Sequence, residues 1–106
     1  MSKHTLDALF ATLEARKGAD PSESYTAKLL ADHNKIAKKL GEEGVEAAIE
    51  IVRGDADKLV SESADVLYHL LVAWVALGVK PDQVWQALEA RTGRSGIDEK
   101  KSRKGE

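Results

Sequence analysis

Apolar side chains recur every third or fourth position along most of this chain, which is the spacing typical of an amphipathic α-helix. A first helix, which Thr5 can cap, carries its apolar face at Leu6, Leu9, Phe10 and Leu13. No alternating run of β-branched residues bounded by turn residues predicts a strand. The pattern therefore predicts an all-α fold, a bundle of four or five helices.

Glycine, proline and short polar segments mark the expected ends of the helices. The segment RKGADPSES, residues 16–24, ends the first helix, and a helical stretch that begins near Ser24 follows it. The pattern leaves open whether this stretch continues through ADHN, residues 31–34, into the next helix. The later helices are expected from about Asn34 to Arg53, from Asp55 or Asp57 to Leu77, and from Pro81 to about Thr92.

The two long helices in the middle of the chain carry carboxylates beside their apolar faces. On the first, Glu43 lies next to an apolar stripe and Glu46 on its flank, whereas Glu42 points further away. On the second, Glu62 and Asp65 lie one turn apart on a shared face. The short link between these helices favours antiparallel neighbours, so the two acidic pairs can converge.

Converging carboxylates repel one another, and some of them stay protonated unless a cation is bound. Mg²⁺ and Mn²⁺ take oxygen ligands and keep water for exchange with phosphate oxygens, so the pattern indicates a divalent cation site for phosphate chemistry. A solvated helix face is the competing interpretation, and it explains one acidic pair more readily than two on successive helices. A ferritin-like di-iron site is disfavoured, because it needs a histidine three residues after an acid on two helices.

The histidines are not assigned as ligands. His69 follows Asp65 by four residues and is interpreted either as a hydrogen-bonded core histidine or as a group behind the acidic site. His4 and His33 are expected on the surface.

Composition narrows the class of protein. The chain has 106 residues, 42% hydrophobic and 32% charged, which fits one soluble domain over residues 1–106 with a small core. A net charge of −2 does not indicate nucleic acid or an anionic membrane as a partner, and the absence of cysteine excludes thiolate metal sites. The longest uncharged run, residues 66–79, is too short to span a bilayer, and no signal peptide precedes it, so a cytoplasmic protein is expected.

The apolar surface of the two long helices exceeds what one partner would cover. The helix ending at Leu77 is apolar nearly all round and is expected at the centre of the bundle. The preceding helix carries a second apolar stripe at Val45, Ile49 and Val52, so it is expected between two layers. Because a chain of this size has a small core, burial of more surface in a homodimer would stabilise it.

Three segments carry a resemblance to a known family. They are SYTAKLL at residues 24–30, KKLGEEGVEAAIE at 38–50 with ESADVLYHLLV at 62–72, and GRSGIDEKKSRK at 93–104. The acidic pairs resemble those of the all-α, MazG-like nucleotide pyrophosphohydrolases, and the first and last segments narrow the likeness to the phosphoribosyl-ATP pyrophosphohydrolase family. Gly44 stands where relatives often have alanine, and it either marks a close approach or is simply tolerated.

The resemblance implies an activity and a metal site. Glu43, Glu46, Glu62 and Asp65 match the Mg²⁺-binding positions, with Glu42 as an additional acid and Mn²⁺ as a second possible ion. The implied reaction is hydrolysis of 1-(5-phosphoribosyl)-ATP between the α and β phosphates, the second step of histidine biosynthesis. The family is most often dimeric, in keeping with the second apolar stripe.

The resemblance also suggests which residues contact the substrate. Those expected to do so are Ser24, Tyr25, Thr26, Lys28, Lys39, Arg94, Ser95, Lys100 and Arg103, with Lys38 and Lys101 as weaker candidates. For the segment at 24–26, the alternative is that Ser24 caps a helix and Tyr25 packs against the protein. For the polar, basic tail at 93–106, the alternative is a solvated chain end.

Two other functions compete with this interpretation. A MazG-like house-cleaning enzyme would hydrolyse a canonical or damaged nucleoside triphosphate and would not need the tail. A helical dimerisation module without chemistry would bind no Mg²⁺, but it leaves the position of the four acids unexplained.

Overall fold

The fold is all-α, as the hydrophobic pattern predicts. The computed structural model describes residues 4–92, and within that range it contains helices and no strand. The helices are α1 (Thr5–Arg16), α2 (Tyr25–Leu30), α3 (His33–Arg53), α4 (Ala56–Leu77) and α5 (Pro81–Glu89).

Side-chain caps set where the helices begin; they correct one expectation and answer one question that the pattern left open. The N-cap of α1 is His4, whose Nδ1 accepts a hydrogen bond from the backbone N–H of Leu6 at 3.1 Å, so Thr5 is the first helical residue and not the cap. Asp32 caps α3 by accepting from the N–H of Lys35 at 3.0 Å, which starts this helix at His33 and separates it from α2.

The other helix ends follow the same local chemistry. Of the two aspartates considered for α4, Asp55 is the cap, because its carboxylate accepts from the N–H of Lys58 at 3.0 Å. Helices α3 and α4 end at Gly54 and Gly78, which adopt the left-handed conformation with φ of 72° and 73°. Helix α5 ends at Glu89, so the expected end near Thr92 was too late.

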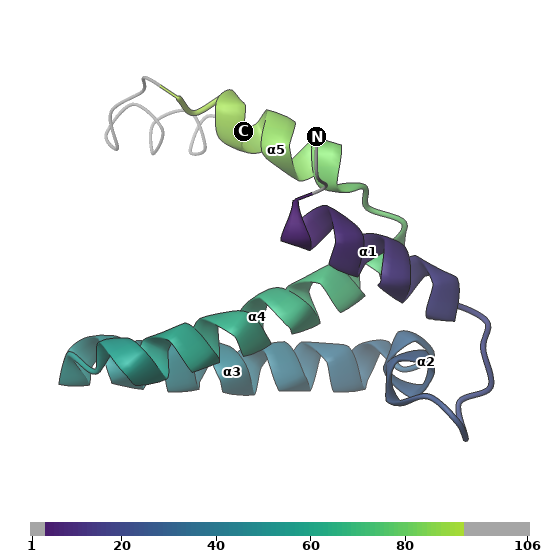
Figure 1. Cartoon of the computed structure of the whole chain (residues 1–106), viewed down its shortest axis with the longest axis horizontal. Coiled ribbons are helices and arrows are strands. Elements are labelled where there is room, and N and C mark those ends of the chain that lie inside the picture. The colour runs from purple at the N-terminus through teal and green to yellow at the C-terminus, as the bar shows by residue number, and fades with distance from the viewer. Residues whose placement is uncertain (1–3, 93–106) are drawn as a thin grey trace.

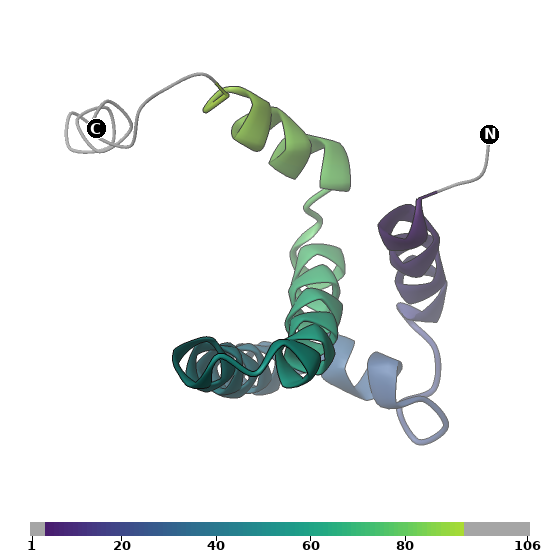
Figure 2. The same ribbon diagram turned by 60° about the vertical axis from the view of Figure 1, so that its left-hand side comes forward.

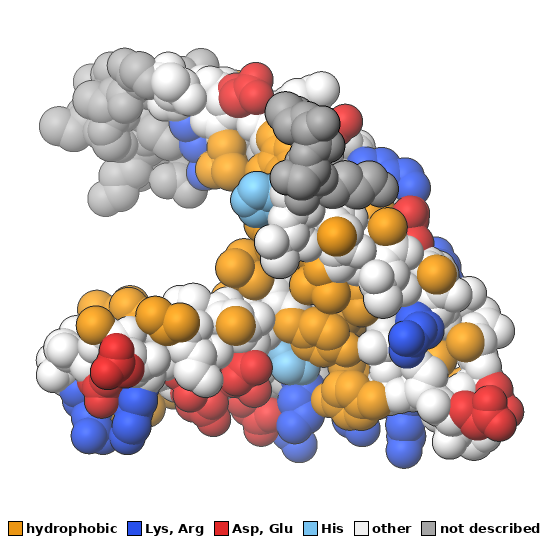
Figure 3. All heavy atoms as spheres, in the orientation of Figure 1, with side chains coloured by type: hydrophobic (Ala, Val, Ile, Leu, Met, Phe, Trp, Pro, Cys, Tyr) orange, Lys and Arg blue, Asp and Glu red, His pale blue; other side chains and the backbone are white. Residues whose placement is uncertain are grey.

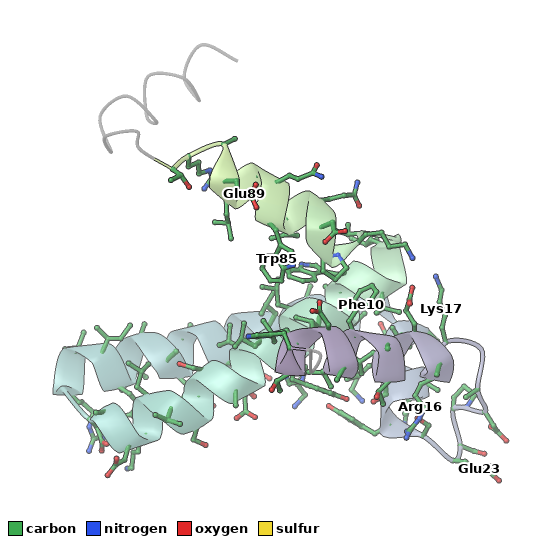
Figure 4. All side chains as sticks on the ribbon, turned by 45° about the horizontal axis from the view of Figure 1, so that its top comes forward. Phe10, Arg16, Lys17, Glu23, Trp85 and Glu89 are labelled. Atoms are coloured by element: carbon green, nitrogen blue, oxygen red, sulfur yellow. The ribbon has the colours of Figure 1, made fainter. Side chains whose placement is uncertain are left out.

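Helices α3 and α4 lie side by side and antiparallel along most of their length (Figure 1). Helices α1 and α2 cover α4 toward its C-terminal end, and Figure 2 shows α1 and α5 standing on the same side of this pair. Helix α5 is anchored by Trp85, whose ring meets that of Trp74 edge-on with centroids 5.9 Å apart; Figure 4 shows Trp85 pointing from α5 toward the body of the molecule. The core is formed by Phe10, Leu13, Leu29, Leu30, Ile36, Leu71, Val72, Trp74 and Val75.

The core occupies only one end of the α3–α4 pair: α4 is central, as predicted, because α1, α2 and α3 all pack on it, but the other described helices leave part of its first half exposed. In α4 the buried residues begin at His69, whereas Val60 is 71% exposed, because α1 and α2 do not reach the loop joining α3 and α4. In α3 the second apolar stripe is not covered by other residues of the described range: Val45 and Val52 are 61% and 88% exposed. Figure 3 shows apolar side chains along the upper edge of this free end, and basic side chains at its tip followed by acidic ones along the lower edge.

Helix α4 is long and apolar enough, by length and composition alone, to cross a membrane. The core helix of a soluble protein passes the same test. Its buried residues include Leu71, Val72 and Trp74, which pack into the core formed with α1 and α2.

Candidate metal centre

Three carboxylates from two helices converge in the middle of the α3–α4 pair. Glu43 on α3 and Glu62 and Asp65 on α4 each offer one oxygen, and these three atoms lie within 4.8 Å of one another. The antiparallel pairing of α3 and α4 brings them together, because residues nearly twenty positions apart then stand opposite each other. Figure 3 shows acidic side chains gathered over this stretch of the two helices.

Glu46 joins the group as an exposed fourth acid. Its carboxyl hydrogen-bonds with that of Glu62, and this bond, followed by burial and by repulsion from Glu46 and Glu43, raises the pKa of Glu62 to about 7. Burial, and then repulsion from Glu46 and Asp65, raises the pKa of Glu43. A hydrogen bond between two carboxyl groups needs one proton between them, so near neutral pH the cluster holds a proton where ordinary acids hold none.

The buried oxygens of the cluster fit a divalent cation. Oε2 of Glu43 and Oε2 of Glu62 are both inaccessible to solvent and have no hydrogen-bond partner in the described structure. A buried carboxylate oxygen without a partner is costly, and a bound cation would compensate it. An all-oxygen donor set of this kind suits Mg²⁺ or Mn²⁺, which are hard cations.

Glu42 lies outside this group of acids. It is exposed, and one of its oxygens is 3.8 Å from the ammonium of Lys39, a surface ion pair within α3. Lys39 is itself partly exposed, one turn before Glu43. On α3, Glu42 is therefore directed toward Lys39 and away from the three converging carboxylates.

The segment at residues 24–26 has a mixed role. Ser24 caps α2 by accepting from the N–H of Ala27 at 3.1 Å, as the structural interpretation of this residue predicted. Tyr25 is 52% exposed, so the prediction that it packs against the protein was wrong; the ammonium of Lys35 lies 5.9 Å from its ring centroid. Lys28 is exposed on the same short helix.

Thr26 is buried, and its hydroxyl lies 2.6 Å from the hydroxyl of Tyr68 on α4. This bond ties α2 to the turn of α4 that follows Asp65. Helical periodicity does not single out Tyr68. The available signal was a hydroxyl-bearing ring within an otherwise apolar stretch, three residues after a carboxylate.

His69 is buried, whereas His4 and His33 are exposed as predicted. Nδ1 of His69 lies 2.9 Å from the backbone carbonyl oxygen of Asp65, so this residue is a buried histidine that is hydrogen-bonded to the backbone of the turn carrying Asp65. The tail residues expected to bind substrate, namely Arg94, Ser95, Lys100 and Arg103, together with Lys101, lie outside the described residues.

The family model and the individual relatives that this chain matches belong to the same family. Residues 6–92 match the family model described as phosphoribosyl-ATP pyrophosphohydrolase. The chain is 56% identical over 105 residues to a phosphoribosyl-ATP pyrophosphatase of Azospirillum brasilense, covering 98% of this chain and 95% of the relative. It is 61% identical over 99 residues to one of Cereibacter sphaeroides, covering 92% and 96%. With one of Rhodospirillum rubrum the identity is 51% over 100 residues, covering 93% and 86%.

Proposed function

The chain belongs to the phosphoribosyl-ATP pyrophosphohydrolase family, which catalyses the second step of histidine biosynthesis, and from this we propose a Mg²⁺-dependent reaction at the acidic cluster. The substrate is 1-(5-phosphoribosyl)-ATP, and the bond broken is the anhydride between the α and β phosphates. The products are 1-(5-phosphoribosyl)-AMP and pyrophosphate.

The observation that carries the proposal is the convergence of three carboxylate oxygens within 4.8 Å. Two of the contributing side chains have a buried oxygen that finds no hydrogen-bond partner among residues 4–92. A protein without chemistry at this place would gain stability by replacing these acids, because they repel one another and are partly desolvated. Glu43, Glu62 and Asp65 are the proposed ligands, and Glu46 completes the set at the exposed edge.

A bound Mg²⁺ supplies positive charge to the phosphate oxygens and lowers the pKa of a coordinated water. The carboxylates of the chain would hold the cation and release the proton that they share. The proton between Glu62 and Glu46 has to leave when both carboxylates become ligands, and the exposed position of Glu46 gives it a route to solvent. Mn²⁺ has the same ligand preference and is the second candidate ion.

Positively charged and hydroxyl side chains near the cluster are the proposed contacts to the substrate. Lys28 is exposed and Lys39 is partly exposed, and both ammonium groups can pair with phosphate oxygens. The Oγ of Ser24 accepts the capping hydrogen bond, so its own O–H proton stays available to a phosphate oxygen. The complete proposed set is Ser24, Tyr25, Thr26, Lys28 and Lys39, with Arg94, Ser95, Lys100 and Arg103 from the tail.

A homodimer is the proposed assembly. The exposed stripe of Val45, Ile49 and Val52 lines a groove of about 340 Å³ with Ala48 and Arg53. An apolar face of this kind on a chain with a small core is stabilised when a second copy covers it. We place the protein in the cytoplasm, with α4 as a core helix and not a membrane span.

The test is pyrophosphate release by the purified protein with Mg²⁺, comparing phosphoribosyl-ATP with a panel of nucleoside triphosphates. We expect a strong preference for phosphoribosyl-ATP that is lost with EDTA. Preference for another triphosphate would move the protein to the house-cleaning class. Turnover of none of them would contradict the enzymatic proposal.

The site is tested by two charge-removing substitutions. Glu43→Gln and Asp65→Asn should abolish turnover and leave the helical circular dichroism spectrum unchanged, because each removes a ligand without changing shape. Glu89→Gln is the matched control, since Glu89 is exposed on α5, away from the α3–α4 pair (Figure 4). Near wild-type turnover of both cluster variants at saturating Mg²⁺ would exclude this site.

A further inference from the structure

His69 is a polar ring at a core position. It is 7% exposed, and Leu71 and Val72, two and three residues later on α4, are fully buried. Burial of an imidazole is costly unless both ring nitrogens have hydrogen-bond partners. The hydrogen bonds of this ring therefore decide whether His69 serves the fold.

The ring of His69 has one partner, and that partner fixes its tautomer. A carbonyl oxygen can only accept, so the 2.9 Å contact with the Asp65 carbonyl places a proton on Nδ1. In the neutral ring Nε2 then carries a lone pair, and this atom is buried and has no partner among the described residues. The Asp65 carbonyl already has the backbone N–H of the next turn as its helical partner, so the fold does not need the imidazole there.

The stability argument therefore favours an apolar residue at position 69. Leucine has a similar volume, a better helix propensity and no acceptor to leave unpaired. A position that breaks a local rule without a compensating gain in stability points to a functional constraint. The nearest functional element is Asp65, one turn earlier, whose carboxylate meets Glu43 and Glu62.

We propose that His69 is a positioning residue for Asp65: its Nδ1–H holds the carbonyl of the turn that carries this carboxylate and so keeps the carboxylate directed at the cation site. Repulsion among the acids pushes this turn away from α3, and the additional hydrogen bond resists that movement. The ring is held in place by Tyr68, which meets it edge-on with centroids 5.1 Å apart and is itself bonded to Thr26. The inference rests on the proposed metal site.

Two substitutions at this position separate positioning from packing. His69→Leu removes the donor and the unpaired acceptor, so we expect a higher melting temperature of the metal-free protein but a Mg²⁺ dissociation constant about ten-fold higher. His69→Asn keeps an N–H close to the position of Nδ1 but leaves a small void. We expect it to melt at a lower temperature and to bind Mg²⁺ nearly as the wild type does.

The measurements are calorimetric Mg²⁺ titration, thermal unfolding and kinetics at varied Mg²⁺. The loss in His69→Leu should appear as a raised KM for Mg²⁺, with kcat largely recovered at saturation. His33→Leu is the control at an exposed histidine and should change neither quantity. A residue that only packs would change stability and Mg²⁺ affinity in the same direction.

The proposal is overturned if His69→Leu binds Mg²⁺ as tightly as the wild type, or if His69→Asn binds it as weakly as His69→Leu. Nitrogen NMR of the wild-type ring gives an independent check that needs no variant: a proton on Nε2 in place of Nδ1 also overturns it. If the wild-type protein itself binds no Mg²⁺, the proposed function fails, which is a different result from wild-type binding that is insensitive to His69.

Discussion

Mg²⁺ affinity should depend on pH, because a proton and the cation compete for Glu62. The hydrogen bond with Glu46, together with burial and repulsion from the neighbouring acids, raises the pKa of Glu62 to about 7. A ligating carboxylate has to be deprotonated, so each bound cation displaces the proton that Glu62 still carries. The affinity should therefore rise with pH through neutrality.

The size of the effect follows from the pKa. With a pKa of about 7, about half of the Glu62 carboxyls are protonated at pH 7, about nine-tenths at pH 6 and about one-tenth at pH 8. Since only the deprotonated form binds, the apparent affinity should fall about ten-fold between pH 8 and pH 6. An ordinary exposed glutamate, with its pKa near 4.3, would give almost no change over this range.

The assay is isothermal titration of Mg²⁺ into the metal-free protein at pH 6, 7 and 8, in two buffers with different heats of protonation. The buffer dependence counts the protons released per bound ion. Glu62→Gln is the control: it should bind Mg²⁺ more weakly, with a flatter pH dependence. Equal wild-type affinity at pH 6 and pH 8, or an unchanged pH dependence in Glu62→Gln, would refute the argument.

Three further predictions follow from the same structure. In metal-free protein the raised pKa of Glu62 contributes stability that is present below pH 4.5 and lost as the pH rises through about 7. The melting temperature should therefore fall over this pH range, and Glu62→Gln should reduce the fall. Gly44→Ala should raise the free energy of unfolding by about 1 kcal/mol, because a new Cβ meets no described atom within 4 Å. Gly54→Ala should lower it by about 1 kcal/mol, because φ at this residue is +72°. Denaturant titration measures both free energies. Val52→Lys should shift the protein from dimer to monomer in analytical ultracentrifugation, because it places a charge in the proposed interface, and an unchanged dimer would exclude that stripe.

The acidic pairs show how much of the metal site can be predicted from helical spacing. Helical spacing alone predicts that Glu43 and Glu46 lie one turn apart and that Glu62 and Asp65 do the same. The short link ending at Asp55 predicts antiparallel helices, and the structure confirms that Glu43, Glu62 and Asp65 meet. Helical rotation also predicts that Glu42 points further away, and the structure adds that it pairs with Lys39.

Errors at the helix ends and in the core have physical causes. The N-cap of α1 is His4 and not Thr5, because Nδ1 of His4 accepts a hydrogen bond from the backbone N–H of Leu6, which has no partner within the helix. Apolar character all round α4 predicted a central helix, but α1 and α2 are too short to cover its first half. Val60 is therefore exposed within one chain.

The sequence by itself determined the properties that depend on neighbours along the chain. Apolar periodicity, caps and glycine stops define an all-α fold, and the spacing of the acids places each pair on one turn. Only the tertiary structure decided which side chains are desolvated together. Burial and contact between residues distant in the chain raise the pKa of Glu62 and join Thr26 to Tyr68. They also leave Nε2 of His69 without a hydrogen-bond partner in the part of the chain that the structure describes. These effects depend on the distances between helices, which arise only when α1, α2 and α3 pack on α4.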